Sequence, residues 1–168
     1  TPKSQATFVS VAGTHVVGIE KETEGVDPFI GYETSFYSLS DEIYFDQLHV
    51  EASKKINKNT KLIGTYIYTA YNKGVLQGLG EDYGTIYSHV AVVEGQFKLN
   101  KDHSIRVEAQ HLLTEQDKGN WVFGLVEYTI SPHWFFAVFD EYNYGNDDKD
   151  SRLNYPNASM GYTKGANR

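Results

Sequence analysis

The stretch NWVFGLVEYTISPHWFFAVFDEYNYGN, residues 120–146, decides the fold because it predicts two β-strands joined by a tight turn. Both sides of the turn are rich in apolar and aromatic residues, and successive side chains of a strand point to opposite faces. If Pro132 and His133 form a two-residue turn, the register of the two strands is fixed. The expected pairs are Ile130 with Phe135, Tyr128 with Ala137, and Val126 with Phe139.

This register gives the hairpin one almost wholly apolar face and one mixed face. The apolar face is expected to hold Val122, Gly124, Val126, Tyr128, Ile130, Phe135, Ala137 and Phe139. The mixed face is expected to hold Trp121, Phe123, Leu125, Glu127, Thr129, Trp134, Phe136, Val138, Asp140, Tyr142 and Tyr144. Aromatic residues also gather at both ends of the pair: Trp134 and Phe135 beside the turn, and Trp121, Tyr142 and Tyr144 at the far end. This layout is typical of a membrane-spanning hairpin with interfacial aromatic residues, although a soluble β-barrel can show much of it.

The composition favours one β-rich domain. A chain of 168 residues is long enough for one domain with a core and too short to favour two. It has 13 Tyr, 9 Phe and 15 Gly but only 4 Pro, a balance typical of a Tyr-rich sheet protein. Although the mean hydropathy of -0.48 would suit a soluble protein, barrel strands alternate and also keep this average low. No apolar run is long enough for a transmembrane helix.

The charge and the absence of cysteine exclude several kinds of chemistry. The formal net charge of -7 opposes nucleic-acid binding, which needs clustered Lys and Arg, and no basic patch is apparent along the sequence. Without cysteine there are no disulfides, no thiolate nucleophile and no cysteine-ligated metal.

The rest of the chain repeats the hairpin pattern. Further strands are expected over residues 6–20, 29–39, 43–56, 61–71, 85–99, 104–114 and 155–164. Short turns at 55–61, 99–104 and 131–133 alternate with longer loops at 72–84, 114–119 and 145–154, as in an antiparallel up-and-down meander. The predicted fold is all-β, a β-barrel or a segment of a larger transmembrane β-barrel, with residues 1–168 as a single unit. About nine strands is an odd number for a bacterial barrel, which favours the segment.

Polar residues on the alternating strands form the main candidate site. They are Glu51, Glu94, Arg106, Glu108, Gln110, Glu127 and Asp140. In a barrel these side chains would point into the lumen, where carboxylates and an arginine pair, fill space or set the charge of a pore. Glu127 with Asp140 superficially suggests a general acid and base, but scattered carboxylates are expected in any wet lumen. We therefore favour structural packing over catalysis.

No sequence motif points to a metal, a cofactor or an enzyme. The six histidines lack metal-site spacing, and there is neither an H-E-x-x-H nor a G-x-S-x-G motif. The acidic loop 146–150 lacks the Gly and the terminal Glu of an EF-hand, so a solvated loop is favoured over a Ca²⁺ site. The glycine loop 78–84 has no Lys-Ser/Thr partner and carries two acids where phosphate would lie. We expect a protein without metal or cofactor that is not an enzyme.

Several strings resemble a known family. They are YSLSDEIYF (37–45), YSHVAVVEGQFKLNKDHSIRVEAQHL (87–112), EYTISPHWFFAVFDEYNYGN (127–146) and YPNASMGYTKGANR (155–168). Together they resemble an uncharacterised family of outer-membrane β-barrel proteins of the Bacteroidota. The resemblance implies a barrel in the bacterial outer membrane, so the expected partners are the lipid bilayer and other outer-membrane proteins. The net charge, as stated above, opposes nucleic acid as a partner. Because the family has no established catalytic residues, the resemblance assigns no catalytic role to any residue of this chain.

Two hypotheses follow. The first is a non-enzymatic outer-membrane β-barrel that serves as a narrow or plugged pore, or as a structural component of an outer-membrane complex. A narrow or plugged barrel is preferred to a wide porin because Trp121, Phe123 and Phe136 make the expected inner face too apolar for open water. The second is a soluble antiparallel β-barrel that binds a small apolar ligand. The two hypotheses differ in whether the purified protein needs detergent to stay in solution: the outer-membrane barrel should need it, and the soluble barrel should not.

Overall fold

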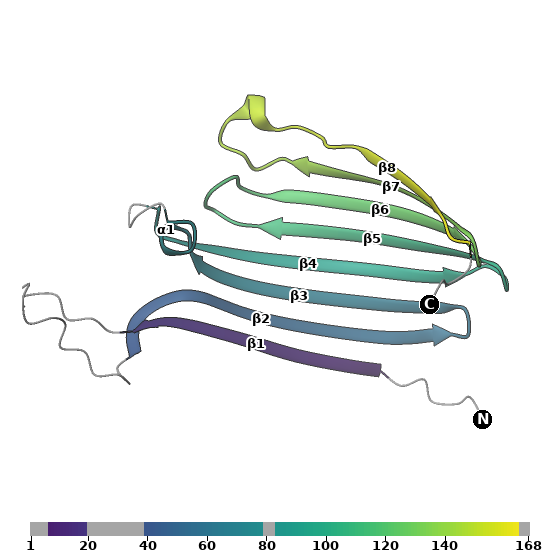
Figure 1. The fold of residues 1–168 in the computed structure, drawn as a ribbon, viewed down its shortest axis with the longest axis horizontal. Helices are drawn as coiled ribbons and strands as arrows, with labels where there is room; N and C mark the ends of the chain where they lie inside the picture. The colour runs from purple at the N-terminus through teal and green to yellow at the C-terminus, as the bar shows by residue number, and fades with distance from the viewer. Residues whose placement is uncertain (1–6, 20–38, 79–82, 165–168) are drawn as a thin grey trace, which may run out of the picture.

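The computed structural model describes residues 7–19, 39–78 and 83–164, which form one antiparallel sheet of eight strands in sequence order (Figure 1). The strands are β1 (Thr7–Ile19), β2 (Leu39–Asn57), β3 (Thr60–Asn72), β4 (Thr85–Lys98), β5 (His103–Leu113), β6 (Trp121–Ile130), β7 (Trp134–Asn143) and β8 (Asn157–Tyr162). Two short helices, α1 (Lys73–Leu76) and η2 (Lys149–Ser151), lie in connections between strands. The predicted all-β, up-and-down meander is confirmed. Among the described residues no helix is long and apolar enough to cross a membrane.

The sheet is open rather than closed, with β1 and β8 at its two edges. β1 pairs directly with β2, which begins at Leu39, earlier than the predicted strand over 43–56. The strand predicted over 29–39 lies outside the described residues except for Leu39.

Short and long connections alternate between the two ends of the sheet, as predicted. The β2–β3, β4–β5 and β6–β7 turns lie at one end, on the right of Figure 1, and the connections with α1 and η2 lie at the other. Asparagine side chains hold the short turns: Asn57 Oδ1 accepts from Asn59 N at 2.8 Å, and Asn100 Oδ1 accepts from His103 N at 3.0 Å. Such side-chain acceptors favour a turn over a continued strand.

The register predicted for the hairpin at 120–146 is wrong by one residue. Ile130 lies opposite Trp134, and the turn contains three residues, with His133 N donating to Ile130 O at 3.1 Å. Ser131 N donates instead to Asp102 O in the neighbouring turn at 2.7 Å, which takes Ser131 out of the strand. The observed pairs are Ile130 with Trp134, Tyr128 with Phe136, and Val126 with Val138. A slip of one residue moves every side chain of β7 to the other face of the sheet.

The two faces of the sheet differ in exposure. On β5, the side chain of Val107 is 40% exposed whereas that of Glu108 is 13% exposed. This alternation recurs along β3, β4 and β6. Side chains crowd on the inner side of a curved sheet and spread on its outer side, so we name the two faces concave and convex.

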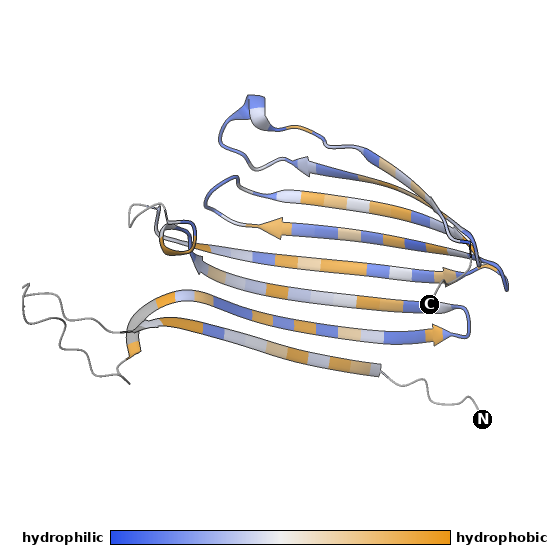
Figure 2. Cartoon of the chain, viewed as in Figure 1, coloured by the Kyte–Doolittle hydropathy of each residue, from blue (hydrophilic) through white to orange (hydrophobic). Residues whose placement is uncertain are grey.

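The concave face is mainly polar and charged in its centre, whereas the convex face is mainly apolar. Following the strand pairs across the sheet, the concave face holds Glu51, Ser53, Ile63, Thr65, Val92, Glu94, Arg106, Glu108, Gln110, Phe123, Leu125, Glu127, Ala137, Phe139 and Glu141. The convex face holds Leu48, Val50, Ala52, Leu62, Gly64, Tyr66, Ala91, Val93, Val107, Ala109, Val122, Gly124, Val126, Phe136, Val138 and Asp140. Figure 2 shows the alternation along the strands as changes between blue and orange.

Within the described residues the sheet is a single layer with almost no buried apolar core. The only buried hydrophobic residues there are Ala70, Ile86 and Ala137. A stable sheet normally buries at least one face against another layer. The many exposed apolar side chains of the convex face therefore need a covering outside this sheet.

Candidate functional site

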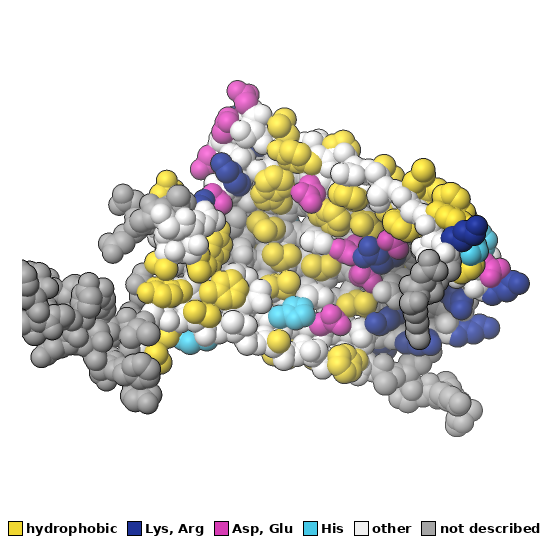
Figure 3. All heavy atoms as spheres, viewed as in Figure 1, with side chains coloured by type: hydrophobic (Ala, Val, Ile, Leu, Met, Phe, Trp, Pro, Cys, Tyr) yellow, Lys and Arg dark blue, Asp and Glu magenta, His cyan; other side chains and the backbone are white. Residues whose placement is uncertain are grey.

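The strongest constellation on the concave face is one arginine held by three glutamates. Arg106 of β5 donates through Nη1 to Glu108 Oε2 at 2.7 Å and to Glu94 Oε2 of β4 at 3.3 Å. Its Nη2 donates to Glu127 Oε2 of β6 at 3.5 Å. Figure 3, which looks onto the concave face, shows this group as magenta spheres around dark blue ones over the middle strands.

The strand register brings these charges together. Glu94 lies directly opposite Glu108, and Arg106 directly opposite Glu127. Like charges in directly opposite positions destabilise a sheet, so the guanidinium offsets a repulsion that the register imposes. The glutamates are also mostly covered, with side chains 16% exposed at Glu94 and 13% at Glu108.

Two glutamines extend the network. Gln96 Nε2 donates to Glu94 Oε1 at 2.5 Å, and Gln110 Nε2 donates to Glu108 Oε1 at 2.5 Å. Three carboxylates around one guanidinium leave this network with an excess of negative charge. Because these carboxylates are held by fixed donors, the arrangement suits a fixed electrostatic role better than proton transfer.

The structure places six of the seven predicted polar residues on the concave face. Glu94, Arg106, Glu108, Gln110 and Glu127 form the network, and Glu51 lies on the same face two strands away, opposite Thr65.

Asp140 is the exception, and its predicted position beside Glu127 is wrong. The three-residue turn puts Asp140 on the convex face, opposite Gly124, while Glu127 lies opposite Ala137 on the concave face. Glu141, which the sequence prediction missed, takes the concave position opposite Phe123. The acid and base pair suggested by Glu127 and Asp140 therefore does not exist.

The five predicted interfacial aromatic residues lie at the expected ends of the hairpin but on both faces. Trp134 and Tyr142 are on the convex face, whereas Trp121 and Phe135 are on the concave face. This reverses the predicted faces of Trp134, Phe135 and Tyr142. Tyr144 follows β7, and its hydroxyl lies 2.5 Å from His111 Nε2.

Each of these rings packs against a neighbour. On the convex face, Trp134 stacks on Phe136 with centroids 5.9 Å apart and packs on Tyr162 at 4.6 Å. On the concave side, Trp121 stacks on Tyr155 at 5.8 Å. Phe135 occupies the space that a side chain at position 161 would need, so Gly161 is required for this contact.

Histidines and tyrosines pair across the convex face. Tyr66 Oη lies 2.7 Å from His89 Nδ1, and His103 Nδ1 lies 2.6 Å from Tyr128 Oη. Together with His111 and Tyr144, these pairs give each ring a hydrogen-bonding partner within the protein. Such internal pairing is what polar groups need where water is scarce.

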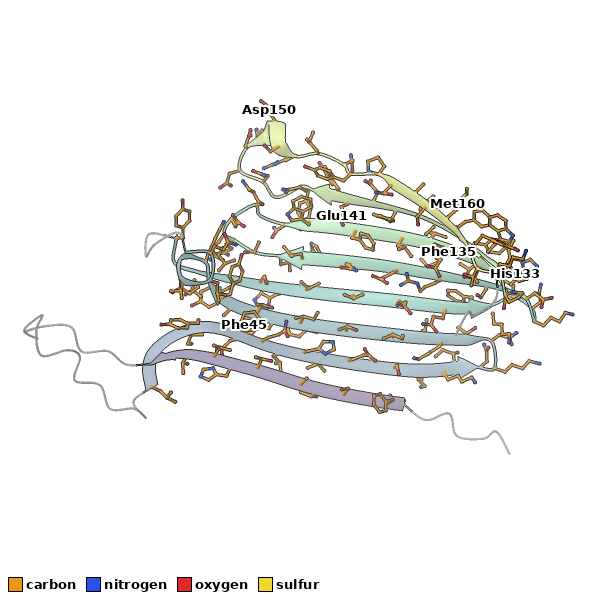
Figure 4. The ribbon with its side chains drawn as sticks, viewed as in Figure 1. Phe45, His133, Phe135, Glu141, Asp150 and Met160 are labelled. Carbon is orange, nitrogen blue, oxygen red and sulfur yellow. The ribbon has the colours of Figure 1, made fainter. Side chains whose placement is uncertain are left out.

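The acidic loop between β7 and β8 turns its oxygens toward its own chain. Asp148 accepts from Ser151 Oγ at 2.7 Å and from Asp150 N at 3.1 Å. These hydrogen bonds, first that of Ser151 and then that of Asp150, lower the pKa of Asp148 below its ordinary value of 3.8. Asp150, labelled in Figure 4, lies at the loop end of the molecule. In the described part of the chain no group of acidic residues and histidines is arranged to hold a metal ion.

An ion pair ties two loops together at the same end. Lys73 Nζ donates to Asp117 Oδ1 at 2.6 Å, linking α1 to the β5–β6 loop. This hydrogen bond raises the pKa of Lys73 above its ordinary value of 10.5. Nearby, Tyr87 N of β4 donates to Gln116 Oε1 at 3.2 Å, which attaches the β5–β6 loop to β4 as well.

Comparison with known proteins gives a family without a described activity. The model of a family described as "Family of unknown function (DUF6029)" matches residues 3–168. No curated protein and no solved structure matches the chain.

Proposed function

We propose that this chain, which belongs to the family of unknown function DUF6029, forms part of the wall of a β-barrel in a bacterial outer membrane. The convex face contacts lipid, and the concave face lines a narrow or plugged interior. The role is non-enzymatic: passage of small solutes or support of an outer-membrane complex. The resemblance of residues 87–112 and 127–146 to outer-membrane barrels of the Bacteroidota supports this localisation.

The observation that carries the proposal is the exposed apolar convex face. Val93 is 64% exposed, Val138 58% and Val126 46%, and they lie on three different strands. A soluble monomer rarely exposes a continuous apolar surface of this extent, because each Å² left in water costs about 25 cal/mol. Lipid tails would cover such a surface without any second protein layer.

The height of the apolar surface fits a bilayer. On the convex face of β4, ring-bearing residues lie at both ends, Tyr87 and His89 at one and Phe97 at the other, with Ala91, Val93 and Gly95 between them. The ten residue-to-residue steps from Tyr87 to Phe97 span roughly 34 Å along the strand. At the usual tilt of about 40°, this corresponds to roughly 25 Å, the height of the lipid-facing surface of known barrels.

The concave face supports a narrow or plugged interior. The Arg106 network spans β4, β5 and β6 with side chains that are mostly covered. Beside it, Phe123 and Phe139 pack with centroids 5.8 Å apart. A mixture of fixed charge and aromatic surface is less polar than the lining of an open water channel. Its negative excess would favour cations over anions in any passage along this part of the wall.

The open edges support a role within a larger assembly. β1 and β8 each have one unpaired side within the described sheet. Exposed edges attract further strands, so we propose that strands of the same protein or of another outer-membrane protein complete the wall.

The two tryptophans of the chain provide the test, since they lie on opposite faces. Trp134 is convex and Trp121 is concave. We would reconstitute the variants Trp121→Phe and Trp134→Phe, each with one remaining tryptophan, in vesicles containing brominated lipid. Quenching of Trp134 fluorescence, with little quenching of Trp121, is expected from contact between the convex face and lipid.

Equal quenching of Trp121 and Trp134 fluorescence by the brominated lipid would contradict the proposal. So would a monodisperse protein that stays in aqueous buffer after detergent is removed, since a soluble barrel with a small apolar ligand would then fit better. Conductance across a planar bilayer would next distinguish a pore from a structural component.

A further inference from the structure

Lysines gather at the turn end of the sheet, in a protein whose net charge is -7. Six of its fifteen basic residues belong to the β2–β3 and β4–β5 turns and the adjoining strand ends: Lys54, Lys55, Lys58, Lys61, Lys98 and Lys101. Four of them lie within residues 54–61 and two at positions 98 and 101, so the sequence alone does not show that the two groups meet. The meander places the two turns side by side, and dark blue spheres mark them on the right of Figure 3.

Hydrogen bonds between turns fix this region. Lys98 N donates to Asn59 O of the β2–β3 turn at 2.7 Å, and Ser131 N of the β6–β7 turn donates to Asp102 O at 2.7 Å. Three successive turns are thus joined through their backbones. Side chains presented from joined turns keep their relative positions better than side chains on separate loops.

The joined turns line an open pocket of about 660 Å³ with an excess of lysine side chains. Five lysines line it, namely Lys55, Lys58, Lys61, Lys98 and Lys101. Arg106 also lines the pocket, but its charge is already compensated by Glu94, Glu108 and Glu127. The two acidic residues of the lining are already paired, Asp102 with Lys101 at 3.7 Å and Glu127 with Arg106 at 3.5 Å. A pocket of this volume matches the size of a small-molecule site.

Three lysines of the pocket have no acidic partner among the described residues. Lys55 and Lys61 are directly opposite on β2 and β3, a like-charge arrangement that destabilises a sheet. Within the described residues, neither they nor Lys98 has a carboxylate within ion-pair distance. A bound anion would relieve this repulsion.

We propose that this pocket binds the phosphate groups of a multivalent phosphorylated ligand. Several separated ammonium groups match a ligand with several charges, because a monovalent anion would neutralise only one of them. Lysine is a compact point charge with three donors and suits phosphate, whereas planar carboxylates are matched better by the fork of arginine. Hydroxyl groups of Ser104 and Thr129 in the lining offer further donors to phosphate oxygens. This proposal is independent of whether the convex face contacts lipid.

Lys54 provides a matched control, because it is adjacent to Lys55 but belongs to the convex face, opposite Leu62. We would measure pyrophosphate binding to the full chain by titration calorimetry at about 20 mM salt, where screening is weak. A dissociation constant below about 1 mM is expected. The variant Lys55→Gln/Lys61→Gln/Lys98→Gln should bind at least about tenfold more weakly, whereas Lys54→Gln should bind like the wild type.

A second variant separates charge from folding. Lys55→Arg/Lys61→Arg/Lys98→Arg keeps three cations and should retain binding within about threefold of the wild type. No measurable binding of pyrophosphate by the wild type, or equal weakening by Lys54→Gln and the triple glutamine variant, would overturn a site for a soluble ligand.

The source of the phosphate is tested in a parallel measurement with vesicles that contain cardiolipin, a lipid whose headgroup carries two phosphates. If the ligand is a lipid headgroup, the triple glutamine variant should lose vesicle association while pyrophosphate competes poorly. If the ligand is soluble, pyrophosphate binds and the same variant associates with vesicles like the wild type. A triple variant that weakens neither interaction would refute the proposal.

Discussion

Neighbouring residues of β5 face two different environments. Val107 and Ala109 lie on the convex face, in a row with Gly95, Val126 and other small or apolar residues of the adjacent strands. Arg106 and Glu108 lie on the concave face and form charged hydrogen bonds with β4 and β6. Each charged group of the concave network has a partner inside the sheet, whereas many apolar side chains of the convex face, such as Val93 and Val126, remain exposed in the described part of the chain.

This difference shows which parts of the molecule are complete by themselves. The concave network fulfils its hydrogen bonding within three strands, so it can form as soon as β4, β5 and β6 pair. The convex face depends on a medium outside the protein. Its response to a new charge should therefore differ strongly from that of the concave face.

The largest expected effect comes from placing an arginine on each face of β5. If the convex face contacts lipid as proposed, Val107→Arg should lower the free energy of unfolding in lipid vesicles by about 2–4 kcal/mol, because a cation would then face the hydrocarbon. Gln110→Arg, on the concave face beside Glu108, should change it by less than about 1 kcal/mol. Urea unfolding in vesicles checks both, and equal losses would remove the distinction between the faces.

Removal of Arg106 should have the next largest effect. Arg106→Gln leaves the opposed Glu94 and Glu108 without their cation, which should lower the free energy of unfolding by about 1–3 kcal/mol after allowance for partial exposure. The same substitution combined with Glu108→Gln should recover part of the loss, because one repelling charge is gone. Urea denaturation of the four proteins of this cycle measures the coupling. A double variant as unstable as the sum of the single variants would show that the network carries no coupling.

A smaller effect is expected from the adjacent acids of β7. Asp140→Asn removes a charge from the convex face and should stabilise the protein in vesicles by about 1 kcal/mol. Glu141→Gln, on the concave face, should have no comparable effect. Measured in detergent instead of lipid, the difference between the two variants should shrink. A stabilisation by Glu141→Gln equal to that of Asp140→Asn would count against the register of β7.

The smallest effect belongs to the loop end, outside both faces. The hydrogen bond from Lys73 to Asp117 raises the pKa of Lys73 above 10.5 in the folded state. The contact is therefore fully present below pH 10.5, and it is lost as the pH rises through this raised value. Titration of Lys73 followed by NMR should give a lower midpoint in Asp117→Asn than in the wild type. An unchanged midpoint would show that the ion pair does not form in solution.

The sequence predicted most of the strands because their alternation is strong. The short turns around Asn57 and Asn100 were recognised from polar residues, and the structure confirms that these asparagines accept turn hydrogen bonds. The sequence also predicted that four charged residues share one face, because successive side chains of a strand alternate between its two faces. They are Glu94, Arg106, Glu108 and Glu127.

The hairpin at 120–146 shows where this reasoning fails. Whether Ser131 belongs to a strand or to the turn depends on its hydrogen bond to Asp102, which lies in a different hairpin. Nothing local to Ser131-Pro132-His133 specifies that contact. One residue more in the turn exchanged the faces of Asp140 and Glu141, and of Trp134 and Phe135.

The sequence alone determined the class of fold, the alternation of short turns and long loops, and the polar character of one face. These properties arise from residues close together in the chain, where the two-residue period and turn chemistry act locally. Only the tertiary structure decided the register of β7, the pairing of Arg106 with three glutamates, and the assembly of lysines from two turns into one pocket. These depend on strands and turns meeting across the sheet, which the local pattern does not encode.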